Sequence, residues 1–292
     1  MSRFLAVCII GFLVAGCVAQ PTPTMIERPV TPAQATMPTF TPTSEPAPTL
    51  LSTAEDHTIE FTIVYDNNAY NPTLRTDWGF SCWIEAGETT VLFDTGGDSA
   101  TLLGNLARLG LDPQTIDLVV LSHAHDDHTG GLAGLLDMGI KPVVYVPAAF
   151  SESFKADVRA RTELVEITEP TEIAPGVYTT GQMGHGIVEQ ALIVQAGAGW
   201  IVVTGCAHPG VAAMVRRAKE VIGGEIVLVM GGFHLGSADK QQIESLVAEF
   251  RQMGVQRVAP CHCTGDQARQ MFAQAYGVDC TLAGAGWIFH ID

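Results

Sequence analysis

The chain has 292 residues, of which 47% are hydrophobic, so it is long enough for one large domain or two small ones. Its formal net charge is −16, and only 15 residues are Lys or Arg. Proteins that bind a nucleic-acid backbone need basic patches, so we expect no nucleic-acid partner. The acidity does not exclude an anionic small molecule, because bound cations would reverse the field locally.

The N-terminus has the order of an export signal. A basic residue precedes an apolar run over residues 4–14, and small residues lead to Cys17. Residues 13–17, Leu-Val-Ala-Gly-Cys, resemble the bacterial lipobox, in which the cysteine is acylated and begins the mature chain. We therefore expect residues 1–17 to be a lipoprotein signal peptide and the protein to be exported and lipid-anchored to the bacterial cell envelope through Cys17. An ordinary secretory signal and an uncleaved anchor are the alternatives.

Residues 18–56 are rich in Pro, Thr and Ala, and the prolines prevent a regular helix or strand ladder. We expect a disordered tether here, followed by one folded domain over residues 57–292. Within that domain, Cys82 and Cys280 are expected to be buried thiols, although an exported protein could join them in a disulfide. The remaining cysteines lie beside histidines.

The domain is expected to begin with strands and to continue with alternating strands and helices. β-Branched and aromatic residues predict a strand over 58–65, and residues 81–85 and 89–93 predict a hairpin. Leucines at helical spacing predict a helix over 99–109, ended by Gly110. Further strands are expected over 117–121, 142–146, 177–180, 191–195, 200–204, 225–230 and 256–260. Further helices are expected over 130–138, 151–160, 209–221, 238–253 and 266–276.

This order occurs in two similar halves, which predicts the fold class. Sheets with helices packed outside them satisfy the alternation. Two mixed sheets lying face to face between outer helices, an α/β fold of the αββα sandwich type, would hold both halves in one domain.

The strongest chemical signal follows the strand expected over 117–121. The chain there reads Ser-His-Ala-His-Asp-Asp-His-Thr-Gly-Gly, and loops at strand ends are where α/β proteins place their sites. Side chains two apart in an extended segment face the same way, so His123 and His125 can bind one metal ion. Asp127 and His128 can reach a second ion where the chain turns.

This motif, with Phe-Asp-Thr-Gly at residues 93–96, resembles the metallo-β-lactamase superfamily, whose members fold as an αββα sandwich. The resemblance covers about residues 60–291. It implies a centre of two divalent metal ions, with zinc expected and manganese or iron as alternatives. It also implies that Asp94 orients the metal-binding loop by hydrogen bonding.

Later residues are candidates to complete the two metal sites. His185 lies where the superfamily supplies the third ligand of the first metal, and Cys206 lies where most members carry a bridging aspartate. A thiolate is a softer ligand, which would favour zinc or weaken the bridge. His208 could replace the missing aspartate or take the role given to His185, so the choice among these three stays open. His262 matches the last ligand of the second metal.

Two further residues are expected to serve the centre without binding metal. His234 lies in a Gly-Gly-Phe-His-Leu segment that follows a buried strand, and it is a candidate proton donor or substrate clamp. Thr264, close behind His262, is expected to support the ligand loop. Cys261 and Cys263 would point away from His262 in an extended segment, so we expect them to pack in the interior.

Residues 205–210, 231–235 and 262–265 look like one branch of the superfamily, typified by the dihydropterin ribofuranosylaminobenzene phosphate synthase-like proteins. The expected function is a metallo-hydrolase that attacks an ester, amide or phosphoester of a small-molecule substrate with a hydroxide activated by two metal ions. Asp127 would orient the nucleophile, and His234 would assist the leaving group. The alternatives are a metal-dependent pterin-type synthase or transferase and a non-catalytic lipoprotein that binds metal or solute.

Overall fold

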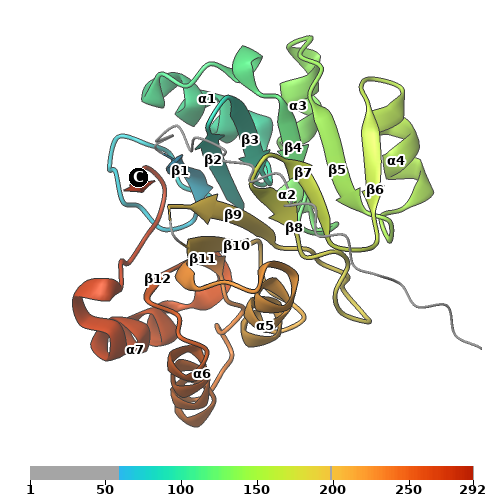
Figure 1. Cartoon of the computed structure of the whole chain (residues 1–292). Helices are drawn as coiled ribbons and strands as arrows, with labels where there is room; N and C mark the ends of the chain where they lie inside the picture. The colour runs from blue at the N-terminus through green and yellow to red at the C-terminus, as the bar shows by residue number, and fades with distance from the viewer. Residues whose placement is uncertain (1–58, 198, 292) are drawn as a thin grey trace, which may run out of the picture. The chain divides into compact units, whose positions relative to one another are not determined.

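The computed structural model describes residues 59–197 and 199–291 (Figure 1). The expected signal peptide over 1–17, its Cys17 and the tether over 18–56 lie outside the described residues. None of the described helices combines the length and the apolar composition that crossing a membrane requires.

Seven strands form the first sheet, in the order β13-β1-β2-β3-β4-β5-β6. Neighbours from β13 to β3 run antiparallel, and neighbours from β3 to β6 run parallel. The bounds are β1 (Ile59–Asp66), β2 (Phe80–Ala86), β3 (Thr89–Phe93), β4 (Leu118–Val120), β5 (Val143–Pro147), β6 (Leu164–Ile167) and β13 (Ile288–Ile291).

Six strands form the second sheet, in the order β12-β11-β10-β9-β8-β7. The pairs β12–β11 and β11–β10 are parallel, and the others are antiparallel, so each sheet has one parallel part and one antiparallel part. The bounds are β7 (Thr171–Ala174), β8 (Val177–Thr179), β9 (Leu192–Ala196), β10 (Gly199–Thr204), β11 (Ile226–Gly232) and β12 (Arg257–Cys261).

Most helices connect parallel strands, whereas the last one connects β12 of the second sheet to β13 of the first. The Asp98 side chain accepts a hydrogen bond from the Thr101 amide at the start of α1, and Gly110, in the left-handed region, ends that helix. The helices are α1 (Ser99–Leu109), α2 (Asp126–Thr129), α3 (Leu132–Asp137), α4 (Glu152–Arg159), α5 (Val211–Ile222), α6 (Lys240–Gln252) and α7 (Asp266–Tyr276). Short 3₁₀ turns are η1 (Pro113–Thr115), η2 (His262–Thr264) and η3 (Gly277–Asp279).

The elements form an αββα sandwich, as the sequence predicted. One apolar layer lies between the two sheets, and one lies between each sheet and its helices. Phe61 of the first sheet and Leu192 of the second belong to the layer between the sheets. Leu102 of α1 packs on the outer face of the first sheet, and Phe250 and Phe272 of α6 and α7 pack on the outer face of the second. Burial of each such side chain contributes about 1.5–3 kcal/mol. Figure 1 shows α1, α3 and α4 beside the first sheet and α5, α6 and α7 beside the second.

Most expected elements lie within two residues of their observed bounds, but three strands were not predicted. These are β6 and β13, the two edge strands of the first sheet, and β7, an edge strand of the second. Their residues are mostly half-buried or exposed. They therefore lack the continuous apolar signal of a central strand.

The chain corner after the metal motif depends on two glycines. A Cβ atom at Gly130 would lie 2.1 Å from the Gly97 carbonyl oxygen, and one at Gly131 would lie 2.1 Å from the Thr95 carbonyl oxygen. Only glycine permits this approach of α2 and α3 to the loop after β3. The two loops that follow the parallel strands β3 and β4 are thereby held together.

Candidate metal centre

Three imidazoles form a first donor set. His123 and His125 follow β4, and His208 follows β10. His123 Nε2 lies 3.1 Å from His125 Nδ1 and 3.2 Å from His208 Nε2, and the third nitrogen pair is 3.3 Å apart. Nitrogen atoms that converge in this way can bind one cation together.

A second donor set adjoins the first and consists of Asp127, His128 and His262. Asp127 Oδ2 lies 3.6 Å from His128 Nε2 and 3.4 Å from His262 Nε2. Asp127 and His128 lie in α2, and His262 begins η2 after β12. Each donor set therefore combines loops of the first sheet with loops of the second.

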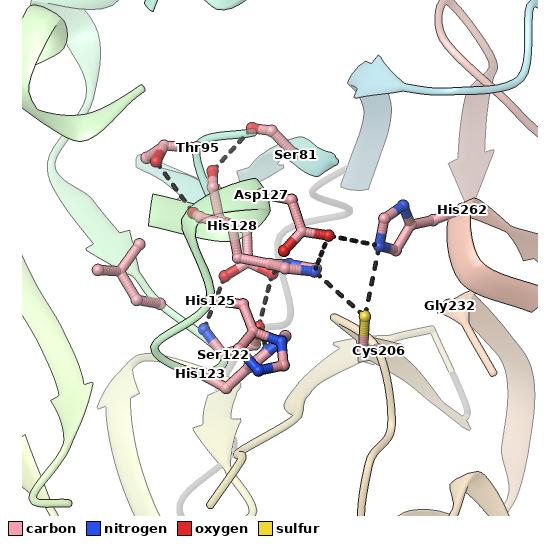
Figure 2. A network of polar contacts seen from close by, with 12 residues as sticks. Ser81, Thr95, Ser122, His123, His125, Asp127, His128, Cys206, Gly232 and His262 are labelled. Carbon is pink, nitrogen blue, oxygen red and sulfur yellow. Dashed lines mark hydrogen bonds and ion pairs between the residues drawn. The ribbon is translucent and has the colours of Figure 1, made fainter. Parts of the chain in front are cut away.

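The sulfur of Cys206 is common to both donor sets. It lies 3.3 Å from His128 Nε2 and 3.3 Å from His262 Nε2, and Figure 2 shows it facing both rings. It also lies within 4.8 Å of donor atoms of His123 and His208. Cys206 thus occupies the bridging position between the two sets.

In three of the histidines the ring nitrogen that faces away from the donor sets also has a polar partner, and this shows whether the residues suit a metal ion. His128 Nδ1 lies 2.7 Å from Asp94 Oδ2, His262 Nδ1 lies 2.9 Å from Asn67 Oδ1, and His123 Nδ1 lies 2.9 Å from Ser122 Oγ. Metal-binding histidines use their second ring nitrogen in this way, which fixes the tautomer and the ring orientation. The residues therefore fit divalent cations.

The pKa values of the side chains differ between the two donor sets. Burial and the neighbouring imidazoles lower the pKa of His123, and burial and His234 lower the pKa of His208 to about 4. Both rings are then neutral at pH 7, which is the form that binds metal. In the second set burial opposes the charge of His128, but the Asp94 carboxylate raises its pKa. Burial also opposes the charge of Asp127, but hydrogen bonding to His262 lowers its pKa to about 2.

Asp94 holds the metal loop from behind. Its carboxylate accepts hydrogen bonds from the Ser122 amide and the Ser122 hydroxyl, both at 2.7 Å, besides its contact with His128. Its carbonyl oxygen accepts a hydrogen bond from Ser81 Oγ at 2.7 Å. Asp94 is fully buried, so the ligand loop is tied to the end of β3.

The site loops concentrate backbone strain. Within the described ranges, four non-glycine residues have φ in the left-handed region: Asp94 (57°), Ala207 (63°), His234 (54°) and His262 (46°). All four follow strands β3, β10, β11 and β12, next to the donor sets. Such conformations persist only where the surroundings fix them, and they are typical of functional sites.

The sequence did not reveal Glu189, a buried carboxylate behind the first donor set. Its two oxygens accept hydrogen bonds from the amides of Cys206, Ala207 and His208 at 2.8–2.9 Å. Burial raises its pKa to about 7 although these amides oppose the shift. Glu189 shapes the turn that carries both Cys206 and His208, and no motif in its own segment signals this.

Asp66, the last residue of β1, and Asn67, which follows it, support His262 and were also missed. Asp66 Oδ2 accepts a hydrogen bond from the His262 amide at 3.0 Å, and Asn67 Oδ1 contacts the His262 ring. Burial raises the pKa of Asp66. About 195 residues separate them from His262, so only the folded sheet brings them together.

The remaining predicted residues surround the donor sets. Thr264 is buried, donates to the Cys261 carbonyl at 2.6 Å and accepts from the Phe233 amide at 3.1 Å, which links the loops after β11 and β12. Cys261 is buried as expected. Cys263 was expected to pack in the interior; it is partly buried, and its Sγ lies 3.5 Å from the Cys206 carbonyl oxygen. The segment is not extended: it forms a short 3₁₀ turn, and His262 at its start has a left-handed φ.

His185 and His234 lie at a pocket beside the first donor set. The structure places His185 apart from both donor sets, exposed in its Gly-His-Gly segment. His234 is exposed and its ring centroid lies 4.4 Å from that of His208. The pocket has a volume of about 560 Å³ and is lined by Met183, Gly184, His185, Gly186, Ile187, His208, Pro209, Ala213 and His234.

Comparison with known proteins places this geometry in a family. Residues 79–220 match the model of the metallo-β-lactamase superfamily. The chain belongs to the metallo-β-lactamase superfamily. The resemblance seen in the sequence is thereby confirmed. The fold implies that divalent metal is bound, and clusters of His, Asp and Cys side chains are present.

Two relatives show where the similarity extends. The chain is 28% identical over 278 residues to a 7,8-dihydropterin-6-methyl-4-(β-D-ribofuranosyl)-aminobenzene-5'-phosphate synthase of Methanocaldococcus jannaschii, which covers 78% of this chain and 95% of the relative. It is 33% identical over 133 residues to the human metallo-β-lactamase domain-containing protein 1, which covers 41% of this chain and 44% of the human protein.

Two crystal structures show the same fold. That of Tm1679, a metal-dependent hydrolase of the β-lactamase superfamily, has a TM-score of 0.69 and 26% identity, and the match covers 80% of this chain and 99% of Tm1679. That of the metallo-β-lactamase fold protein YhfI from Bacillus subtilis has a TM-score of 0.62 and 15% identity over 80% and 99% of the two chains.

Proposed function

We propose that the protein is a metal-dependent hydrolase that holds two divalent metal ions and cleaves an ester, amide or phosphoester bond in a small molecule. One observation carries this proposal: two donor sets share the Cys206 sulfur, and a pocket adjoins the first of them at His208. The similarity to Tm1679, a metal-dependent hydrolase, supports the same reaction class.

The donor chemistry favours zinc. The sets combine imidazole nitrogens, one thiolate and one carboxylate, a mixture that suits zinc better than magnesium or calcium. Manganese and iron are the alternatives. The bound ions would supply a water of lowered pKa and an electrophile for the carbonyl or phosphoryl oxygen.

The chain itself supplies orientation and a proton. Asp127 stays ionised, and its side chain is 20% exposed, so it can accept a hydrogen bond from a water molecule that enters the centre. His234 lines the pocket beside His208 and can donate a proton to a departing alkoxide or amine. The apolar side chains of Met183, Ile187 and Pro209 would exclude water from one side of the substrate.

An exposed aromatic ring lies beside His262 of the second donor set. Trp78 is 56% exposed, and its ring centroid lies 5.0 Å from that of His262. An indole beside a metal ligand can pack against a planar or apolar part of a substrate. The Trp78→Ala variant is therefore expected to raise KM more than it lowers kcat.

The test is a screen of the full chain, stripped with a chelator and reloaded separately with zinc, manganese or iron. Phosphodiesters, phosphomonoesters, carboxylic esters and lactones serve as substrates. Turnover that requires metal and falls about 10²-fold or more in His234→Ala supports the proposal. Full turnover of that variant on every accepted substrate would remove His234 from the mechanism. No turnover on any substrate with any metal would favour a lipoprotein that only binds metal or solute.

A second candidate is a synthase or transferase, favoured by the similarity to the archaeal pterin synthase over most of this chain. The same donor sets could orient a phosphorylated substrate for displacement by an amine. Labelled solvent oxygen distinguishes the two reactions, because hydrolysis introduces it into the product and amine displacement does not.

We also propose that the protein is exported and anchored by acylation at Cys17, in keeping with its position after an apolar run. In a bacterial host the Cys17→Ser variant is then expected to leave the membrane fraction. Unchanged membrane association of that variant would contradict acylation at this residue.

A further inference from the structure

Two cysteines lie close together beside the end of strand β11, which has β10 on one side and β12 on the other. Cys206 follows β10 and Cys263 lies in η2 after β12, and these are the two strands that flank β11. Their sulfur atoms lie within 4.8 Å of each other, in a group completed by a nitrogen of His234. The Cys263 sulfur also contacts the Cys206 carbonyl oxygen. A disulfide between them requires the two sulfur atoms to approach to about 2 Å, so the side chains must move toward each other.

Gly232, the last residue of β11, makes this approach possible. A Cβ atom at position 232 would lie 2.7 Å from the Cys263 sulfur and 2.4 Å from the Gly205 carbonyl oxygen. Any side chain there would displace one of the two cysteine loops. The strand order brings the two cysteine loops together, and Gly232 leaves room for their sulfur atoms to approach each other.

The two thiols differ in access. Cys263 is less buried over the whole residue than Cys206, and its sulfur lies within 4.8 Å of a ring nitrogen of His234, which is exposed. A reagent from solution would reach the Cys263 sulfur first. The three other described cysteines are placed differently. Cys82 and Cys261 are buried in the layer between the sheets, and Cys280 packs against the outer layer of the second sheet.

We propose that Cys206 and Cys263 are a redox-active dithiol that forms a disulfide by exchange with a small-molecule disulfide. The Cys263 sulfur attacks one sulfur of the reagent, whose S–S bond breaks, and one thiol leaves with a proton. The Cys206 sulfur then attacks Cys263 in the mixed disulfide and releases the second thiol. The two cysteines lose two electrons and two protons, and the reagent gains them.

Oxidation would remove the bridging ligand. Cys206 in a disulfide cannot be a thiolate, so both donor sets would lose their shared sulfur. Conversely, metal bound to the Cys206 sulfur would protect it from exchange. Metal content and oxidation state would then exclude each other, whatever bond the centre cleaves. The disulfide depends on the cysteine geometry and not on the proposed hydrolysis.

The test uses the full chain, stripped of metal and equilibrated with excess oxidised glutathione. Peptide mapping by mass spectrometry under non-reducing conditions is expected to find a peptide that joins Cys206 to Cys263. A phosphine reductant should reverse it, and loading with zinc beforehand should reduce the joined fraction at least about tenfold. Glutathione mixed disulfides without the joined peptide, or joining of Cys206 to another cysteine, would overturn the proposal.

Two variants sharpen this result. Cys263→Ser should give no joined peptide, whereas the matched control Cys280→Ser, which alters a partly buried thiol elsewhere, should give the wild-type amount. Elemental analysis of oxidised and reduced wild-type protein after exposure to zinc measures the consequence. We expect the oxidised protein to lose at least half of its bound zinc, and equal zinc in both forms would show that the disulfide does not control the centre.

Discussion

The two donor sets differ in the burial of their side chains and in the hydrogen bonds that support them. In the second set His128 and His262 are buried, and each has a polar partner behind it, Asp94 or Asn67. In the first set His125 is exposed and His208 is half-buried. His208 depends on a turn that Glu189 holds through backbone amides. The second set is therefore preorganised, whereas the first is open to the pocket and to solvent.

Removal of Asp94 should have the largest effect. Asp94→Ala leaves the Ser122 amide, the Ser122 hydroxyl and His128 Nδ1 without their buried acceptor. We expect the free energy of unfolding to fall by about 3–5 kcal/mol and metal to be lost first from the second set. Urea unfolding and elemental analysis measure both. The matched control is Asp117→Ala, an exposed acid that accepts from the Thr90 amide, which should cost about 1 kcal/mol.

Glu189 should make the metal-free protein sensitive to pH. Its pKa rises on folding from 4.5 to about 7, so the folded state prefers the protonated acid. Its contribution to stability is complete below pH 4.5 and is lost as the pH rises through 7, a change of roughly 3 kcal/mol. Unfolding of chelator-treated protein from pH 4 to 8 measures the slope. The Glu189→Gln variant should lack this component, and an equal slope in the variant would exclude Glu189 as its source.

Asn67 offers a way to weaken only the second set. The Asn67→Ala variant removes the partner of His262 Nδ1, and loss of such a support costs about 10–100-fold in metal affinity. Competition with a chromophoric chelator should show one weakened site and one unchanged site. Asn71→Ala, which removes an acceptor of the Thr73 amide away from the centre, serves as the control. Equal weakening of both sites would contradict the separate construction of the two sets.

The smallest effect on folding is expected for His125. Because its side chain is exposed, His125→Ala should change the free energy of unfolding by about 0.5 kcal/mol or less. Metal at the first set should nevertheless fall, since one of three nitrogens is removed. His290→Ala, an exposed histidine paired with Glu60, is the control. A large loss of stability would show that the first set also supports the fold.

The sequence revealed those parts of the fold and site whose signals lie within one segment. The helix over residues 99–109 was predicted to the residue because its leucines repeat at helical spacing and Gly110 ends it. The sandwich followed from the alternation of elements. Edge strands such as β13 were missed because a neighbour, and not their own pattern, holds them in the sheet.

The supports of the centre could not be read in the same way. Asn67 and Glu189 reach the ligands from distant parts of the chain, so no local spacing indicates them. The position of Cys263 depends on the left-handed backbone of His262, which no composition signals. The choice between His185 and His208 also required the fold, since both follow strands at suitable places. The structure brings His208, and not His185, to His123 and His125.

The mixed origin of each donor set reaches beyond catalysis. His123 and His125 come from the first sheet and His208 from the second, and the other set is divided in the same manner. A cation held by either set would link the two halves of the chain through its ligands. Because the cation binds only the folded arrangement, its binding would stabilise the contact between the halves by mass action. Either half, expressed separately, would contain only some of the ligands of each donor set. Metal uptake would therefore report that the two halves have joined correctly.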